Sequence, residues 1–137
     1  MGNPDVLSLL APSARTLLTL GAVLGGLGVA LGAFGAHGLE NLAYVTPDRI
    51  ATFRTGVLYH LVHALALLVV GLLLLQGIDA RAAGWLFVAG IAVFSGSLYV
   101  LVLADLPIMG AVTPIGGVAF IAGWSLLAWR VWQGVAV

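Results

Sequence analysis

Four long apolar stretches, separated by short polar segments, make up most of this 137-residue chain. They run over residues 16–36, 55–75, 83–104 and 111–132. Each has about the 20 residues that a helix needs to cross a bilayer at roughly 1.5 Å per residue. Their length and continuity favour helices over the short alternating segments of a membrane β-barrel. The pattern predicts an all-α fold, a single domain over residues 1–137 built as a polytopic bundle of four transmembrane helices.

Local signals refine where these helices begin. Thr46, Pro47 and Asp48 form a typical helix start, with an N-cap hydroxyl, a proline at the first position and a carboxylate in the first turn. The second helix is therefore expected to start near residue 47. Thr113 and Pro114 repeat the signal, where Pro114 either opens the fourth helix or kinks one that began earlier. The first stretch is too long for the core of a signal peptide, which favours an uncleaved helix.

Composition agrees with a membrane solvent. Hydrophobic residues make up 62% of the chain and charged residues 7%, against about 25% charged in soluble domains. A water-soluble enzyme is excluded because there is too little polar surface to coat it. Five basic and five acidic residues give no positive field for a nucleic acid. Without cysteine there is no disulfide, thiolate metal site or thiol nucleophile, so the partner that composition indicates is the lipid bilayer.

The few arginines predict an orientation. With four spans, three arginines lie on the side of both termini and two on the other side: Arg15, Arg81 and Arg130 against Arg49 and Arg54. By the positive-inside rule, both termini are expected in the cytoplasm. Three tryptophans would then form an aromatic belt at the cytoplasmic surface: Trp85, Trp129 and Trp132.

Glycines in the first stretch predict how its helix packs. Five of them recur at intervals of four and three residues along one helix face: Gly21, Gly25, Gly28, Gly32 and Gly35. Lipid tails are as apolar as leucine, so helices in a bilayer associate through small residues that let backbones approach. We expect a tight left-handed packing seam here. Its partner is either another helix of the chain or a second copy in a homo-oligomer.

Polar residues of the spans gather at one depth, in the outer leaflet. The candidate ligand-binding set is His37, Glu40, Tyr59, His60, His63, Ser95, Ser97, Tyr99 and Thr113. The opposite halves of the helices carry no ionisable group. A continuous pore or proton wire would need polar groups at both depths. The pattern therefore favours a cavity or a hydrogen-bonded cluster that opens only to the outer side.

Helical spacing sharpens this cluster. Gly56, His60 and His63 fall on one narrow face of the second helix, with Tyr59 at its edge. On the third helix, Ser95 and Tyr99 share a face while Ser97 points away from it.

Several functions fit such a cluster. The histidines can hydrogen-bond to serine, tyrosine or backbone groups and fix the bundle, or the cluster can bind a small ligand or a lipid headgroup. Two histidines at i, i+3 with a third nearby could ligate a metal or haem, although no carboxylate shares their depth and no cofactor is the leading expectation. A small transporter is a further alternative. Serine-based catalysis is disfavoured because no carboxylate could orient a histidine base.

Several strings, taken in order, resemble a known family. They lie at residues 31–38 (LGAFGAHG), 59–68 (YHLVHALALL), 94–99 (FSGSLY), 112–117 (VTPIGG) and 123–124 (GW). Together they resemble the domain-of-unknown-function 423 family (YgdD-like) of small bacterial inner-membrane proteins, which is related to animal transmembrane protein 256. The resemblance covers about residues 21–132. It implies a four-helix architecture and an inner-membrane location, but no particular activity.

The leading hypothesis is a non-enzymatic integral membrane protein. Its outer-leaflet polar cluster either binds a small ligand or lipid headgroup or only locks the bundle. The main alternative, from another class, is a metal- or haem-binding accessory subunit of a membrane redox complex.

Overall fold

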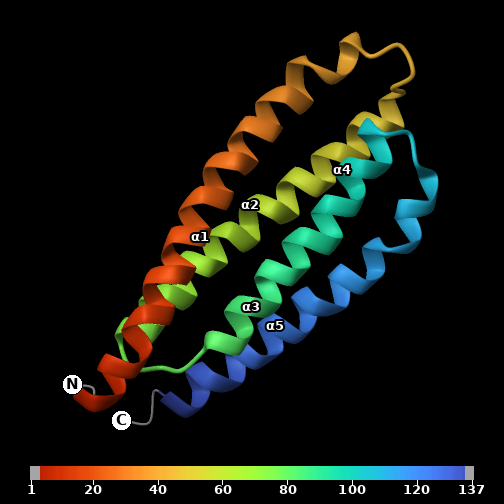
Figure 1. Cartoon of the computed structure of the whole chain (residues 1–137). Coiled ribbons are helices and arrows are strands. Elements are labelled where there is room, and N and C mark those ends of the chain that lie inside the picture. Colours follow the sequence, from red (N-terminus) through yellow and green to blue (C-terminus); the bar gives the residue numbers. More distant parts are fainter. Residues whose placement is uncertain (1–3, 135–137) are drawn as a thin grey trace.

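A computed structural model describes residues 4–134 of the chain. Four helical rods cross its length (Figure 1). The first two are α1 (Pro4–His37) and α2 (Pro47–Leu75). The third rod consists of α3 (Arg81–Gly90), η2 (Ile91–Ser95) and α4 (Gly96–Leu103), and the fourth of η3 (Pro107–Ala111) and α5 (Thr113–Gly134). A short 3₁₀ turn, η1 (Leu39–Asn41), follows α1. All described elements are helical, and four helices are long and apolar enough to cross a membrane.

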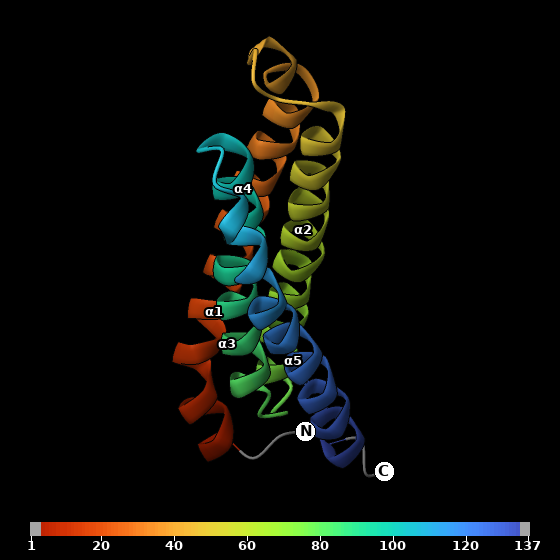
Figure 2. The ribbon, with the colours of Figure 1, turned by 90° about the vertical axis from the view of Figure 1, so that its right-hand side faces the viewer.

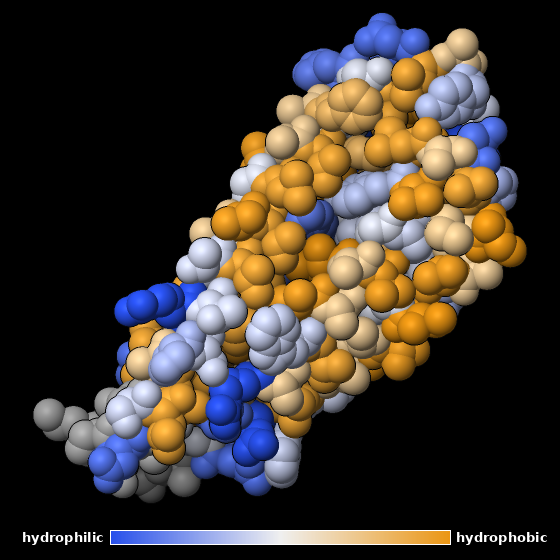
Figure 3. All heavy atoms as spheres, in the orientation of Figure 1, coloured by the Kyte–Doolittle hydropathy of each residue, from blue (hydrophilic) through white to orange (hydrophobic). Residues whose placement is uncertain are grey.

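The rods lie side by side, and successive rods run in opposite directions (Figures 1 and 2). α1 and the third rod both pack on α2, and α5 packs on the third rod. Leu17 of α1 also reaches α3, beside Gly84. We call the end with the α1–α2 and α4–α5 connections the loop end and the opposite one the terminal end. Figure 3 shows apolar side chains over the middle of one face and hydrophilic residues gathered at both ends, the surface expected of a membrane-spanning bundle.

The first helix begins earlier than residue 16, the predicted start. α1 starts at Pro4 and passes through Pro12. A proline removes one backbone hydrogen bond from a helix interior. Leu10 and Ala14 are buried in the core near the terminal end, next to Ala80 and Ala83. Tertiary packing therefore extends the helix beyond its apolar stretch.

The glycine face of α1 packs against α2 of the same chain. A Cβ at Gly21 would lie 2.9 Å from Leu68 Cδ2 and 3.0 Å from the Ala64 carbonyl oxygen. The same close approach continues toward the start of α2, where Gly28 meets Leu61, Gly32 meets Val57 and Gly35 meets Phe53. Gly25 departs from the predicted seam, since nothing lies within 4 Å of its Cβ position. Association of two copies through this face stays a prediction.

The third rod is interrupted by a π-helical turn, η2, flanked by Gly90 and Gly96. A π turn inserts one residue into a helix and bulges its backbone. α5 approaches this bulge through Gly116, where a Cβ would lie 2.7 Å from Phe94 Cα. α5 itself begins at Thr113, so Pro114 lies in its first turn and does not kink a longer helix.

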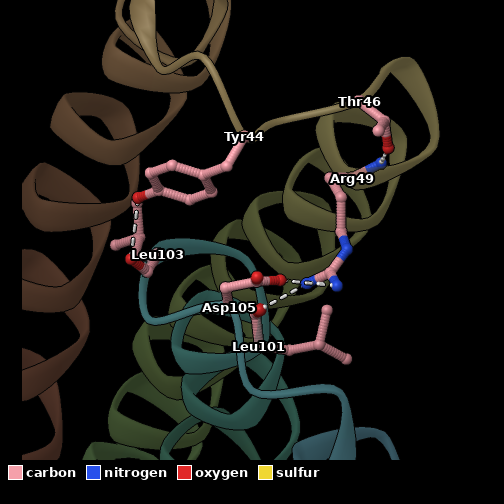
Figure 4. A network of polar contacts seen from close by, with 6 residues as sticks. All are labelled: Tyr44, Thr46, Arg49, Leu101, Leu103 and Asp105. Carbon is pink, nitrogen blue, oxygen red and sulfur yellow. Dashed lines mark hydrogen bonds and ion pairs between the residues drawn. The ribbon is translucent and has the colours of Figure 1, made fainter.

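Polar contacts at the loop end hold α2 against α4 (Figure 4). Arg49 forms an ion pair with Asp105 at 2.8 Å and donates a 2.7 Å hydrogen bond to the Leu101 carbonyl. The Tyr44 hydroxyl donates to the Leu103 carbonyl at 2.9 Å. Both donors reach carbonyls of the last turn of α4, which lack partners within the helix. These contacts fix the register between α2 and α4.

A tight turn connects α2 to the third rod at the terminal end. Gly77 adopts a left-handed conformation (φ 84°), and the following Ile78 N–H donates to the Leu73 carbonyl at 3.0 Å, which is a glycine C-cap. The Arg81 side chain hydrogen-bonds to Asp79 and lowers the pKa of that carboxyl. The turn folds the third rod back against α2.

Close approach at Gly116 gives a test of this packing. We expect Gly116→Ala to lower the free energy of unfolding by about 1–3 kcal/mol, because its methyl group would overlap the Phe94 backbone. Gly117→Ala is the matched control, since its Cβ would lie 3.8 Å from Phe94 Cδ2, an ordinary contact. Tryptophan fluorescence during SDS titration in mixed micelles measures both variants. Equal stabilities would contradict the packing at η2.

Candidate functional site

The two histidines of α2 lie near the middle of their helix. Because α2 begins at Pro47, His63 is about 24 Å from that end and about 18 Å from Leu75 at 1.5 Å per residue. The two side chains thus lie near the middle of α2, and their place in the outer leaflet stays a prediction. His60 and His63 are 2% and 3% exposed, so their ring nitrogens need partners inside the protein.

His63 has a partner on each ring nitrogen. The Trp124 indole N–H of α5 donates to Nε2 at 3.0 Å, and Nδ1 lies 2.7 Å from the Tyr59 carbonyl oxygen. An indole N–H can only donate, so Nε2 must accept. Nδ1 then carries the hydrogen and donates to the carbonyl. This pair of contacts defines a neutral imidazole in a single tautomer that bridges α2 and α5.

His60 is a neighbour of His63 on the surface of α2 but packs toward α1 and α4. Its Nδ1 lies 3.1 Å from the Tyr99 hydroxyl on α4, and its ring lies beside Gly28 of α1. Nε2 is buried without a hydrogen-bond partner among the described residues; the Leu24 backbone interacts with the ring but lies outside hydrogen-bond geometry. His60 and His63 therefore face different helices.

The predicted serine and threonine positions lie between the third rod and α5. Ser97 Oγ lies 2.7 Å from Thr113 Oγ1 and donates to the Phe94 carbonyl at 2.9 Å. Ser95 is fully buried in η2, and its hydroxyl has no partner within residues 4–134. Ser97 thus joins α4 to α5, as Tyr99 joins α4 to α2.

His37 and Glu40 do not join these contacts. Both are exposed at the loop end, where α1 ends and η1 follows. Within the described residues, neither side chain makes a hydrogen bond or an ion pair with the other predicted site residues. Among the nine predicted positions, two side-chain pairs join different helices, His60 with Tyr99 and Ser97 with Thr113.

A pocket opens between α2 and α5, beside His63. Its volume is about 480 Å³, and it is lined by Leu58, Tyr59, Val62, His63, Phe94, Gly117, Phe120, Ile121 and Trp124. Leu58 and Ile121 are 59% and 69% exposed in the middle of membrane-spanning helices, so the pocket opens sideways toward lipid. An opening toward the outer side, which the sequence suggests, stays a prediction beside this lateral one.

Aromatic rings form much of the pocket wall. The rings of His63 and Phe120 are stacked with centroids 3.5 Å apart and planes 11° apart. Tyr59 lies nearly parallel to both, at 15° and 25°, and also contacts Phe94 at 4.5 Å. The Tyr59 hydroxyl has no hydrogen-bond partner within the described part of the chain. Among the lining side chains, the Tyr59 hydroxyl is therefore the donor that is open to an incoming ligand, because the Trp124 indole N–H already donates to His63.

Sequence reasoning missed the α5 half of this site. Trp124, Phe120 and Gly117 belong to a segment that carries no ionisable group and was assigned to the dry side of the bundle. A signal was present, since tryptophans concentrate at the two membrane interfaces whereas Trp124 lies near the middle of α5. A mid-span tryptophan needs a hydrogen-bond acceptor at that depth, and His63 supplies it.

Comparison with known proteins places the chain among small membrane proteins. Residues 31–117 match the family model described as "Protein of unknown function (DUF423)". The chain belongs to this family. It is 50% identical over 117 residues to the UPF0382 membrane protein YwdK of Bacillus subtilis, an alignment that covers 82% of this chain and 93% of that protein. A UPF0382 membrane protein of Staphylococcus epidermidis is 44% identical over 114 residues, with 82% and 92% covered.

No solved structure matches the chain. The family match and its relatives agree with the four apolar helices in making this a membrane protein. For this DUF423 family member, the matched region includes Tyr59 and His63 and ends at Gly117. Trp124 lies beyond it, so the two sides of the His63–Trp124 bond fall inside and outside the family model.

The tautomer of His63 gives a direct test of the site. We expect ¹⁵N NMR of histidine-labelled protein to show one neutral imidazole with hydrogen on Nδ1 and none on Nε2. Trp124→Phe removes the indole donor to Nε2 and should shift that nitrogen signal. It should also lower the free energy of unfolding by about 1–3 kcal/mol, because a buried acceptor loses its partner. Hydrogen on Nε2 in the unsubstituted protein would contradict the bridge.

Trp85→Phe is the matched control, since Trp85 is 51% exposed on α3 and does not line the pocket. It should leave both histidine spectra and the stability nearly unchanged.

Proposed function

We propose that this membrane protein binds an apolar molecule from the bilayer in the pocket between α2 and α5, without chemical conversion. The observation on which this depends is the sideways-opening cavity of about 480 Å³ with its apolar and aromatic lining. Binding cavities for small organic molecules measure about 300–1,000 Å³ and are lined mainly by such side chains. A molecule dissolved in the hydrocarbon core reaches this opening without crossing a polar surface.

The depth of the pocket argues against a lipid headgroup as the ligand. Headgroups lie about 15 Å from the bilayer centre, since the hydrocarbon core is about 30 Å thick. Tyr59 and His63 lie near the middle of α2, and no charged side chain lines the pocket. The pocket therefore suits the apolar part of a molecule. A lipid headgroup, one of the ligands that the sequence suggests, fits it less well.

The geometry of the histidines favours this function over a metal or haem centre. Both nitrogens of His63 are engaged, one by Trp124 and one by the Tyr59 carbonyl. Nδ1 of His60 lies against Tyr99, and its ring faces α1. Ligation by both histidines would break these contacts.

The same proposal keeps the orientation and location that the sequence suggests. Arginine counts support both termini in the cytoplasm, and the resemblance supports the bacterial inner membrane. With that orientation, the pocket opens near the bilayer centre.

Photolabelling in liposomes tests the binding function. A long-chain hydrocarbon bearing a diazirine, present at low mole fraction, should label peptides that contain Tyr59 and Trp124. Excess unlabelled hexadecane should displace this labelling, because a discrete site saturates whereas bulk lipid contact does not. Leu72 is a built-in reference, since it is 56% exposed on α2 outside the pocket and should be labelled without displacement.

Gly117→Leu should reduce the displaceable labelling by about fivefold or more, an effect on affinity of roughly 1 kcal/mol or more. Gly117 lines the pocket, and its Cβ position is unobstructed, so the new side chain fills the cavity without a backbone clash. Gly26→Leu adds the same side chain at a position with nothing within 4 Å, outside the pocket, and should change nothing. Labelling that hexadecane cannot displace, equal in all three proteins, would overturn the proposal.

A further inference from the structure

The pocket between α2 and α5 has a wall of nearly parallel rings. Tyr59, His63 and Phe120 have planes within 25° of one another, and Phe94 and Trp124 complete the lining. An alkyl chain gains nothing from this alignment, because branched aliphatic side chains would cover it equally well. His63 and Phe120 cover each other and are each 3% exposed, whereas Tyr59 and Trp124 are 40% and 45% exposed. A planar ring gains offset stacking on these two exposed rings in addition to the burial of its surface.

The polar groups of the pocket differ in whether they are free to form a hydrogen bond with a ligand. His63 is saturated by Trp124 and by the Tyr59 carbonyl. The Trp124 indole has only one hydrogen to donate, and it points at His63. The Tyr59 hydroxyl remains, on a side chain that is 40% exposed. At the centre of a bilayer no water competes for a phenol hydrogen, so a ligand acceptor meets no competition there.

The geometry points to a quinone-type molecule as the ligand: a planar ring that carries a carbonyl oxygen on an apolar tail. The ring stacks on the exposed Tyr59 and Trp124 rings, and the Tyr59 hydroxyl donates to a ring carbonyl. The tail leaves through the opening between Leu58 and Ile121, which faces lipid. This inference rests on the proposed binding of an apolar molecule in the same pocket, and it adds the chemical class of that molecule.

Size and charge are consistent with this class. The volume of about 480 Å³ admits a substituted ring but not a whole long-chain lipid, so the remainder of a long molecule must lie in the bilayer. No lining residue carries a formal charge, which suits a neutral ring with weak acceptors and disfavours an ion. The proposal concerns binding only and requires no electron transfer by the protein.

A competition pair separates this inference from the binding function itself. In the diazirine assay, decylbenzoquinone and decylcyclohexane carry the same tail on a planar ring with carbonyls and on a puckered ring without them. Decylbenzoquinone should displace the probe at about a fivefold or more lower mole fraction. Equal displacement by both compounds would overturn the ring inference and leave the proposed function standing. Failure of both, with no displacement by hexadecane, would remove the two proposals together.

The role of the hydroxyl is tested by Tyr59→Phe, which keeps the ring and removes the donor. It should weaken decylbenzoquinone binding by about two- to tenfold, the range for one hydrogen bond, and leave decylcyclohexane unaffected. Tyr44→Phe is the matched control, because Tyr44 donates to Leu103 at the loop end and lies outside the pocket. An unchanged preference for the quinone in Tyr59→Phe would show that the hydroxyl does not bind it.

A second readout uses tryptophan fluorescence, which quinones quench. A protein that keeps only Trp124, with phenylalanine at its other three tryptophans, should show saturable quenching by decylbenzoquinone. A protein that keeps only Trp85, which is 51% exposed away from the pocket, should show quenching that rises linearly with quinone in the bilayer. Gly117→Leu in the Trp124-only protein should abolish the saturable part. Linear quenching of both reporters would overturn the inference.

Discussion

Close backbone approach at glycine is the constraint on which this bundle depends. In a bilayer, an apolar side chain is equally well solvated by lipid and by protein, so helices meet where small residues let them. α1 meets α2 through its glycine face, α2 meets α4 at Gly56, and α5 meets the third rod at Gly116 and Gly123. α2 and α5 contact each other mainly through aromatic side chains. The pocket lies where the two backbones stay apart.

The hydrogen bond between Trp124 and His63 spans that gap. It links residues 61 positions apart and satisfies a polar atom on each helix at a depth where water is absent. Removal of either partner would leave a buried polar group unpaired, which costs more than the net value of the bond itself. The same bond leaves the histidine saturated, and this shifts the candidate chemistry from the imidazole to the Tyr59 hydroxyl. His63, which its spacing from His60 marks as a candidate metal ligand, thus acts as a structural bridge beside the cavity.

The remaining polar pairs follow the same principle at other interfaces. His60 with Tyr99 joins α2 to α4, and Ser97 with Thr113 joins α4 to α5. Each is a hydrogen bond between two helices inside the hydrocarbon region. The polar residues of this chain therefore have two roles. Those that pair across helices hold the helices together, and the Tyr59 hydroxyl is left for a ligand.

Local sequence signals determined the solvent, the four spans and the start of α2, because charge scarcity, apolar length and the Thr46–Pro47 cap each operate within a few residues. They also identified the glycine face of α1. They could not identify α2 as its partner, the π turn at η2, the extension of α1 to Pro4 or the Trp124 donor to His63. Each of these depends on which side chains of separate helices meet. That choice is made by the packing of the whole bundle, in which a shift of one helix turn would pair different residues.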